Sequence, residues 1–246
     1  MLPVLVRLGP VTIYSLGFLL ALGFLLATFV VWKQARSSGH PEEKVLDSLF
    51  LTVFLSLILA RIGFVVTNWP TFMVDYSRAF LWVKYPGLSY PALVVTGILV
   101  SALAARWSGL EVLWLWDSLA IAASFLVVLA NFGCYLDGCF APAANVPLVL
   151  TVLAILLVGL LLFLARILAK TAELADLARR RGLFFLCYLI FQLVSLLMTT
   201  WSTGNRFRIG AYLAGLAITI VVLAVRYKLF FAYVYRRLSQ RRFGSN

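Results

Sequence analysis

The sequence predicts an all-α, polytopic membrane protein with seven transmembrane helices. Of its 246 residues, 63% are hydrophobic and only 12% are charged, whereas about a quarter of the residues of a soluble domain are charged. Seven apolar runs approach the length of about 20 residues that a helix needs to cross a bilayer. Aromatic residues make up 15% of the chain, which is typical of a protein anchored at two membrane–water interfaces. A water-soluble enzyme, a disordered chain, a collagen and a coiled coil are excluded.

The predicted spans follow one another along the chain with short connections. We place them at residues 11–32, 45–66, 91–105, 112–130, 149–166, 183–201 and 209–225. Lys33 and Arg36 follow the first run instead of preceding it, so this run is expected to stay as a helix and not to be cleaved as a signal peptide. The aromatic stretch 69–90 predicts an interfacial or re-entrant element. Because no fixed-period repeat is evident, residues 1–246 are predicted to form a single seven-helix domain.

Two charged segments lie beside the spans. Residues 171–181 place leucines at helical spacing among acidic and basic side chains, which predicts a short cytoplasmic helix, with a solvated connector as the alternative. Residues 227–246 mix aromatic and basic side chains and predict a C-terminal anchor at the membrane interface. The formal charge of +12 gathers beside apolar segments, so anionic lipid and not nucleic acid is the expected partner.

The distribution of lysine and arginine predicts the orientation of the chain. With seven spans, the loops on one side carry five of the 21 basic residues and those on the other side carry fifteen. Basic residues favour the cytoplasmic side of a membrane. The N-terminus is therefore predicted outside and the C-terminus in the cytoplasm, and the remaining basic residue, Arg61, lies within the second span.

Arg61 is the charged residue that most needs an explanation. An arginine at the centre of a spanning helix costs about 2.5–3.5 kcal/mol on the insertion scale. Because Arg61 lies a few residues from the predicted outer end of its span, its side chain could snorkel to the interface. The alternative is a binding site for a phosphate or carboxylate group. Gly63 beside it would let another backbone approach closely.

The most polar cluster at the predicted outer end of a span is residues 131–139. Its glycines permit a non-helical path, which is tolerated at membrane depth only where it lines a protein or water-filled cavity. Asp137, the only acid of the cluster, is a candidate general base or a partner for Arg61, with helix capping as the alternative. Cys134 and Cys139 would face an oxidising compartment, so they form a disulfide, act as free nucleophilic thiols, or pack as small hydrophobes.

The remaining polar candidates lie in the sixth predicted span and in the loop between it and the seventh. Gln192 is deep in the sixth span, where its amide must find partners inside the bundle. Arg206 and Arg208 form a predicted basic outer loop that either binds a phosphate or is solvated. A single histidine, His40, and three cysteines do not supply a His-based metal cluster, a Ser-His-Asp triad or a four-cysteine zinc site, so no metal or cofactor is expected.

Four stretches carry a family resemblance. Residues 8–17 (LGPVTIYSLG) with the following LGF, and residues 60–64 (ARIGF), are similar to the first helix and to the Gly-Arg-Ile-Gly-Tyr element of the prolipoprotein diacylglyceryl transferase family. Residues 86–92 (PGLSYPA) and 131–139 (NFGCYLDGC) occupy the places of two further signature segments. The seven-span layout with an outside N-terminus also resembles that family.

The resemblance implies transfer of a diacylglyceryl group from phosphatidylglycerol to the cysteine thiol of a lipoprotein precursor, on the outer face of the bacterial cytoplasmic (inner) membrane. This chemistry needs a cation that neutralises the departing glycerol phosphate and a means of forming the thiolate. The implied substrate-binding residues are Arg61, Tyr14, Gln192, Arg206 and Arg208. The implied catalytic residues are Asp137, Asn131, Cys134, Cys139 and Tyr90.

Several side chains differ from the family at these places. Tyr90 stands in place of its histidine, and Asn131 and Gln192 stand in place of two arginines. An amide does not reproduce the bidentate contact of an arginine with phosphate. Two alternatives therefore stay open: a catalytically degenerate membrane protein that binds lipid or a partner protein, and a thiol-dependent membrane enzyme that uses the two cysteines of the 131–139 cluster.

Overall fold

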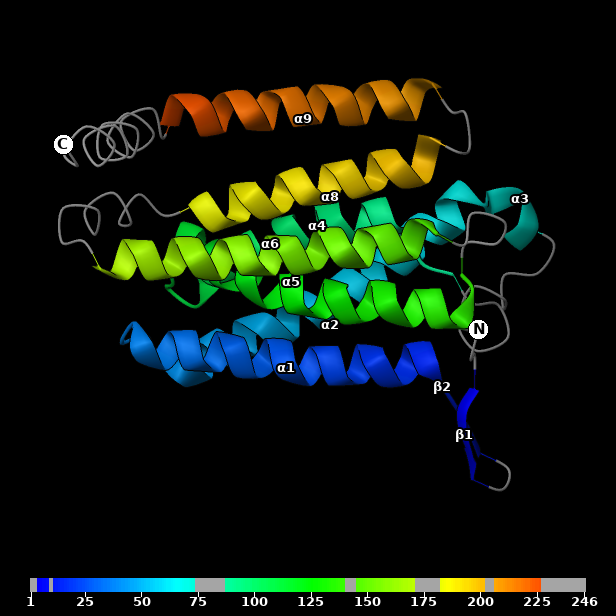
Figure 1. The fold of residues 1–246 in the computed structure, drawn as a ribbon, viewed down its shortest axis with the longest axis horizontal. Coiled ribbons are helices and arrows are strands. Elements are labelled where there is room, and N and C mark those ends of the chain that lie inside the picture. Colours follow the sequence, from blue (N-terminus) through cyan, green and yellow to red (C-terminus); the bar gives the residue numbers. More distant parts are fainter. Residues whose placement is uncertain are drawn as a thin grey trace, which may run out of the picture. The chain divides into compact units, whose positions relative to one another are not determined.

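The structure is a computed structural model that describes residues 4–8, 11–73, 87–139, 145–170, 182–201 and 206–226. Its elements are β1 (Val4–Leu8), β2 (Val11–Tyr14), α1 (Ser15–Ser37), α2 (Glu42–Thr67), α3 (Trp69–Phe72), α4 (Tyr90–Trp107), α5 (Val112–Asp137), α6 (Val146–Lys170), α8 (Leu183–Trp201) and α9 (Arg206–Arg226) (Figure 1). Within this part of the chain, seven helices are long and apolar enough to cross a membrane. The all-α, multi-pass fold is therefore confirmed, and the orientation of the termini stays a prediction. The segments 171–181 and 227–246 lie outside the described residues.

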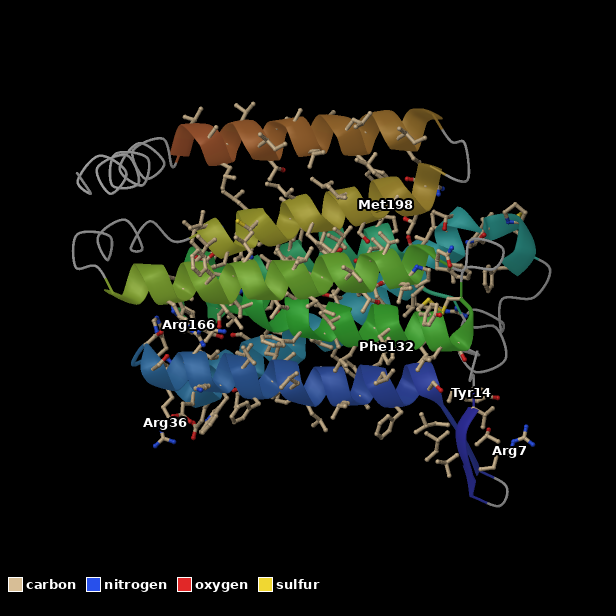
Figure 2. The ribbon with its side chains drawn as sticks, viewed as in Figure 1. Arg7, Tyr14, Arg36, Phe132, Arg166 and Met198 are labelled. Atoms are coloured by element: carbon tan, nitrogen blue, oxygen red, sulfur yellow. A yellow bond between two sulfur atoms is a disulfide. The ribbon has the colours of Figure 1, made fainter. Side chains whose placement is uncertain are left out.

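The first helix begins later than predicted. Residues 11–14, which we assigned to the first span, form β2 and pair antiparallel with β1, so that Val4 lies opposite Tyr14. The physical reason is that β-branched residues are favoured in strands, and three of these four residues are β-branched. Helix α1 begins only at Ser15. Figure 2 shows Arg7 and Tyr14 on this hairpin, beside the N-terminal end of α1.

Helix α5, which corresponds to the fourth predicted span, ends later than predicted. The predicted span 112–130 is extended by seven residues, because α5 stays helical as far as Asp137 and does not take the non-helical path that the glycines permit. Gly138 then takes a φ of 78°, the left-handed conformation that commonly ends a helix. The backbone N–H groups of Gly138 and Cys139 both donate hydrogen bonds to the carbonyl oxygen of Cys134. A single glycine at the helix end, and not a glycine-rich loop, therefore makes the break.

Two compact units make up the chain, Thr28–Leu119 and Met1–Ala27 with Ala120–Asn246, and each is described by itself. In the first unit, α2 packs against α4 through small residues. A Cβ added at Gly63 would lie 2.8 Å from the Cβ of Ala92, so the close approach predicted at Gly63 is confirmed. The hydroxyl oxygens of Ser48 and Ser108 lie 2.9 Å apart. Small residues allow such close backbone packing of membrane helices. The single domain stays a prediction.

In the second unit, glycines allow α5 to pack closely on α1. A Cβ added at Gly133 would lie 3.1 Å from the Cα of Leu16, and one added at Gly23 would lie 2.9 Å from a methyl carbon of Leu126. Further along the chain, α8 contacts both α6 and α9, so these three helices form a layer in chain order (Figure 1).

Candidate functional site

Arg61 lies near the C-terminal end of α2, and only 4% of its surface is exposed. Its Nη1 donates a hydrogen bond of 2.9 Å to the carbonyl oxygen of Gly87. The ring centroids of Phe64 and Phe72 lie 5.6 and 5.7 Å from the guanidinium carbon. The side chain is therefore buried among protein groups, and the choice between snorkelling and a binding site for an anion stays open.

Local sequence explains how these groups meet. Phe64 follows Arg61 by three residues and so lies on the same face of α2. Helix α2 ends at Thr67, and the side-chain amide of Asn68 donates a 2.9 Å hydrogen bond back to the carbonyl oxygen of Phe64. The short helix α3 then brings Phe72 to Phe64, with the two rings edge to face and their centroids 6.1 Å apart.

The segment that leads into α4 completes this cluster, which we call the Arg61 cluster (Arg61, Phe64, Phe72 and Gly87). The N–H of Ser89 donates a 3.3 Å hydrogen bond to the carbonyl oxygen of Ala60. Gly87 lies directly against the ring of Phe64. Tyr90 is the first residue of α4 and is 38% exposed, so the structure brings this predicted catalytic residue into the same part of the fold as Arg61.

The Arg61 cluster presents a permanent positive charge in an apolar setting. A guanidinium stays protonated in proteins, and its planar fork matches phosphate and carboxylate groups. Attraction to the faces of two rings stabilises it, by about 0.5–2 kcal/mol per ring depending on desolvation. Hydrogen bonds from such a group to a phosphate are about twice as strong as neutral ones. The arrangement is therefore suited to bind an anionic headgroup.

The predicted cluster 131–139 lies at the C-terminal end of α5. Cys134 and Cys139 form a disulfide with a Cα–Cα distance of 5.2 Å, so of the three states considered for these cysteines the structure shows the disulfide. The amide nitrogen of Asn131 is buried and makes no hydrogen bond with the described part of the chain. Asp137 is half-buried at the helix end. Asp137 and Arg61 belong to different units, and their pairing stays a prediction.

The other predicted residues are spread over the fold. Gln192 is 1% exposed, and its amide donates a hydrogen bond to the hydroxyl of Tyr188, one turn earlier on α8. Tyr14 is 55% exposed at the end of β2. Arg206 and Arg208 lie in the first turn of α9, so the basic loop predicted for them is wrong. Arginine has a high helix propensity, so basic residues before an apolar run do not by themselves keep a helix from starting.

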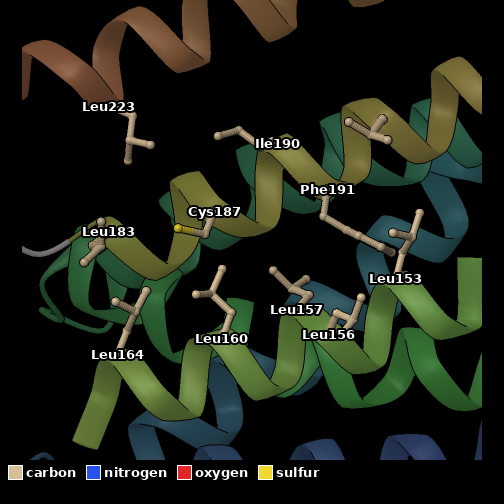
Figure 3. A pocket seen from close by; sticks show the side chains of 11 residues that line it. Leu153, Leu156, Leu157, Leu160, Leu164, Leu183, Cys187, Ile190, Phe191 and Leu223 are labelled. Atoms are coloured by element: carbon tan, nitrogen blue, oxygen red, sulfur yellow. The ribbon is translucent and has the colours of Figure 1, made fainter. Parts of the chain in front are cut away.

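A second feature of the Met1–Ala27 and Ala120–Asn246 unit is an apolar pocket. It has a volume of about 530 Å³ and lies among α6, α8 and α9 (Figure 3). Its lining residues are Leu153, Leu156, Leu157, Leu160, Leu164, Leu183, Cys187, Ile190, Phe191, Val194 and Leu223. The volume is in the range of small-molecule sites. Because the lining offers hydrocarbon side chains and one thiol, the pocket is suited to hydrocarbon and not to a polar group.

Sequence reasoning missed four residues that the structure makes important. Phe64, Phe72 and Gly87 surround Arg61, and Tyr188 receives the hydrogen bond from Gln192. The spacing of three between Arg61 and Phe64, and of four between Tyr188 and Gln192, was a usable signal. No helical spacing marks Phe72 or Gly87 as partners of Arg61, although Gly87 lies in the quoted stretch 86–92, because these two residues lie outside α2. Among the described residues, no group of three or more His, Cys, Asp or Glu side chains lies together as a metal site would require.

The comparisons with known proteins agree on one family. The family model of the prolipoprotein diacylglyceryl transferases matches residues 3–230. Phosphatidylglycerol–prolipoprotein diacylglyceryl transferase 2 of Clostridium perfringens is 32% identical over 130 residues, which are 52% of this chain and 49% of that protein. The phosphatidylglycerol–prolipoprotein diacylglyceryl transferase of Clostridioides difficile is 26% identical over 132 residues, 53% of each chain. The enzyme of the same name from Staphylococcus carnosus is 26% identical over 105 residues, 42% of this chain and 38% of that protein.

The chain spans about half the length of the curated relatives it matches. The family model, in contrast, extends from the N-terminal hairpin to beyond the end of α9. It therefore includes the Arg61 cluster, the disulfide end of α5 and the apolar pocket. On the strength of this match, the chain belongs to the prolipoprotein diacylglyceryl transferase family.

Proposed function

We propose that this protein transfers a diacylglyceryl group from phosphatidylglycerol to the cysteine thiol of a lipoprotein precursor, at the outer face of the bacterial cytoplasmic membrane. The observation that carries this proposal is the family match over residues 3–230. Relatives named phosphatidylglycerol–prolipoprotein diacylglyceryl transferase provide the substrate classes. The buried guanidinium of Arg61 supplies a cation for an anionic lipid headgroup.

The proposed reaction exchanges one bond to carbon for another. The acceptor thiolate forms a sulfur–carbon bond to the glyceryl carbon that carries the phosphate, and the carbon–oxygen bond to that phosphate breaks. Glycerol phosphate leaves with the electron pair of the broken bond, and the thiol proton passes to a base, for which Asp137 is the candidate. In this proposal Arg61 stabilises the charge on the departing phosphate, which is electrostatic catalysis by a preorganised cation.

Two observations support the membrane side and the lipid site. A disulfide at the end of α5 fits an oxidising compartment, which is the outer side in the proposed orientation. The apolar pocket supports binding of a hydrocarbon chain, so its proposed ligand is an acyl chain of the lipid.

One specific observation favours a second candidate, a catalytically degenerate lipid-binding protein. Asn131 and Gln192 stand at places where the resemblance puts arginines. The amide of Gln192 already donates to Tyr188, and the amide nitrogen of Asn131 is buried. Neither amide carries a charge that would compensate a leaving phosphate. In this second candidate, Arg61 still binds the anionic headgroup but no group is transferred.

The experiment that tests both candidates is intact-mass detection of transfer. Purified protein is incubated with phosphatidylglycerol vesicles and a peptide that contains a lipoprotein signal cysteine. We expect a diacylglyceryl adduct on the peptide, and a rate reduced about 10²–10³-fold in Arg61→Ala, the range for loss of one electrostatic catalytic group. Arg106→Ala is the matched control, because Arg106 is exposed in the last turn of α4, is not among the proposed site residues, and its loss removes the same charge from the surface.

The possible results separate the candidates. An adduct that depends on Arg61 supports the transferase. Bound phosphatidylglycerol without an adduct supports the degenerate lipid-binding protein. An adduct that persists in Arg61→Ala contradicts the proposed role of Arg61. Transfer that appears only after reduction of the disulfide would favour the thiol-dependent alternative, since Cys134 and Cys139 are joined in the structure.

A further inference from the structure

We propose that Gly87 sets the preference of the protein for anionic lipid headgroups, because it positions the guanidinium of Arg61 through the ring of Phe64. This inference rests on the proposed function, in which Arg61 binds the headgroup. Gly87 is a positioning residue in this proposal. It touches Arg61 and Phe64, and the lipid is bound by the arginine.

Gly87 is required for space and not for its backbone conformation. It is not among the glycines with a positive φ, so an alanine there meets no backbone strain. A Cβ added at Gly87 would, however, lie 2.3 Å from the Cζ atom of Phe64 and 2.5 and 2.8 Å from its two Cε atoms. Such distances force the ring to move.

The ring of Phe64 connects this steric contact to the charge. Its centroid lies 5.6 Å from the guanidinium carbon of Arg61 and 6.1 Å from the ring of Phe72. Phe72 is 4% exposed, so the displaced ring of Phe64 has little room on that side. The remaining response is a shift of the guanidinium, of the segment that contains Gly87, or of both.

Gly87 also holds Arg61 through its own backbone. Its carbonyl oxygen accepts the 2.9 Å hydrogen bond from Nη1. Gly87 therefore has two roles: its carbonyl oxygen accepts the hydrogen bond that orients the guanidinium, and its lack of a side chain leaves the space in which the ring of Phe64 lies. A shift of the segment lengthens the hydrogen bond, and a shift of the ring removes the aromatic face, so either response to a side chain at position 87 disorients Arg61.

Orientation of the guanidinium matters for headgroup choice. A bidentate contact between arginine and phosphate needs the two N–H groups aligned with two oxygens. Phosphatidylglycerol carries a net negative charge, whereas phosphatidylcholine carries a compensating cation beside its phosphate. Correct alignment of Arg61 is thus expected to raise the affinity for phosphatidylglycerol more than that for phosphatidylcholine.

The test measures the ratio of the two lipids bound to purified full-length protein after equilibration in mixed vesicles of phosphatidylglycerol and phosphatidylcholine. We expect Gly87→Ala to lower this ratio by about tenfold or more, the effect of losing one hydrogen bond to a charged group. Gly97→Ala is the matched control. It lies in the same unit, on α4, and its added Cβ would be 3.8 Å from the nearest atom, the hydroxyl oxygen of Ser56, so we expect no change in the ratio.

A rescue variant distinguishes positioning from folding. In Gly87→Ala/Phe64→Leu the smaller side chain leaves room for the added Cβ, and we expect recovery of most of the lost preference. If Gly87→Ala lowers the binding of both lipids equally, or leaves their ratio unchanged, the inference is overturned. The double variant failing to recover the ratio would also overturn it.

Arg61→Ala, measured alongside, identifies which claim fails. If Arg61→Ala abolishes the preference and Gly87→Ala leaves it intact, only the positioning role of Gly87 is overturned. If Arg61→Ala itself keeps the preference for phosphatidylglycerol, the headgroup site of the proposed function is wrong, and the inference about Gly87 is overturned with it.

Discussion

Replacing both Cys134 and Cys139 by serine removes the disulfide that closes the C-terminal end of α5, and should lower the thermal stability of the protein. The disulfide joins residues that are five apart in sequence. A cross-link stabilises mainly because it restricts the unfolded chain. The variant keeps the turn at Gly138, so the change isolates the contribution of the covalent bond.

The magnitude follows from the short loop. For a loop of about five residues the chain-entropy relation gives about 2 kcal/mol at 25 °C. For a chain of 150–250 residues, 1 kcal/mol corresponds to about 2–4 °C in Tm, so the upper estimate is about 4–8 °C. Residual structure in the unfolded state lowers this value, because helical segments in detergent keep Cys134 and Cys139 close together. We therefore expect a decrease of about 2–4 °C.

The assay is thermal unfolding in detergent micelles followed by circular dichroism, with and without reductant. Cys187→Ala is the matched control, because the other two cysteines of the chain are joined to each other, so the loss of Cys187 breaks no cross-link. Reductant should lower the Tm of the wild type and of this control, and should not change the Tm of the double serine variant. The reasoning is refuted if the double variant is as stable as the wild type, or if reductant lowers its Tm equally.

Two further predictions concern the unit formed by Met1–Ala27 and Ala120–Asn246, the first its helix packing and the second its apolar pocket. Gly133→Ala should destabilise the protein, because the added Cβ would lie 3.1 Å from the backbone of Leu16. The steric cost is about 1–3 kcal/mol, and the higher helix propensity of alanine offsets up to about 1 kcal/mol of it. Gly159→Ala is the control on α6, where the added Cβ meets open space, and it should be neutral or stabilising; equal melting temperatures for the two variants would refute this prediction. Leu160→Trp should partly fill the apolar pocket and weaken the binding of long-chain phosphatidylglycerol more than that of short-chain phosphatidylglycerol, as measured by native mass spectrometry; an equal effect on both chain lengths would argue against an acyl-chain site.

The spans could be predicted closely because the membrane imposes one dominant constraint. A bilayer-crossing helix must be apolar over about 20 residues, and this requirement is local in sequence. The predicted span 183–201 coincides with α8, and the predicted span 209–225 lies within α9. Arg61 stood out for the same reason, since a charge in an apolar run is costly.

The ends of the helices were less predictable because hydropathy and backbone hydrogen bonding are different quantities. Residues 131–137 are more polar than the rest of their span, yet α5 continues through them, since a polar side chain near a helix end does not interrupt the backbone ladder. Residues 11–14 are apolar enough to extend the first span, yet they pair with β1. Apolar character predicts burial in lipid or protein, and does not by itself choose between strand and helix.

By itself, the sequence determined that this protein crosses the membrane seven times, that it resembles one family, and that Arg61 needs a partner. Only the tertiary structure decided what that partner is. Phe72 and Gly87 reach the guanidinium from two segments on either side of residues 74–86, and the steric fit between Gly87 and Phe64 exists only once those segments meet. The physical reason is that hydropathy and helical spacing act between neighbours in sequence, whereas the surroundings of a buried charge are set by residues that the chain brings together from a distance.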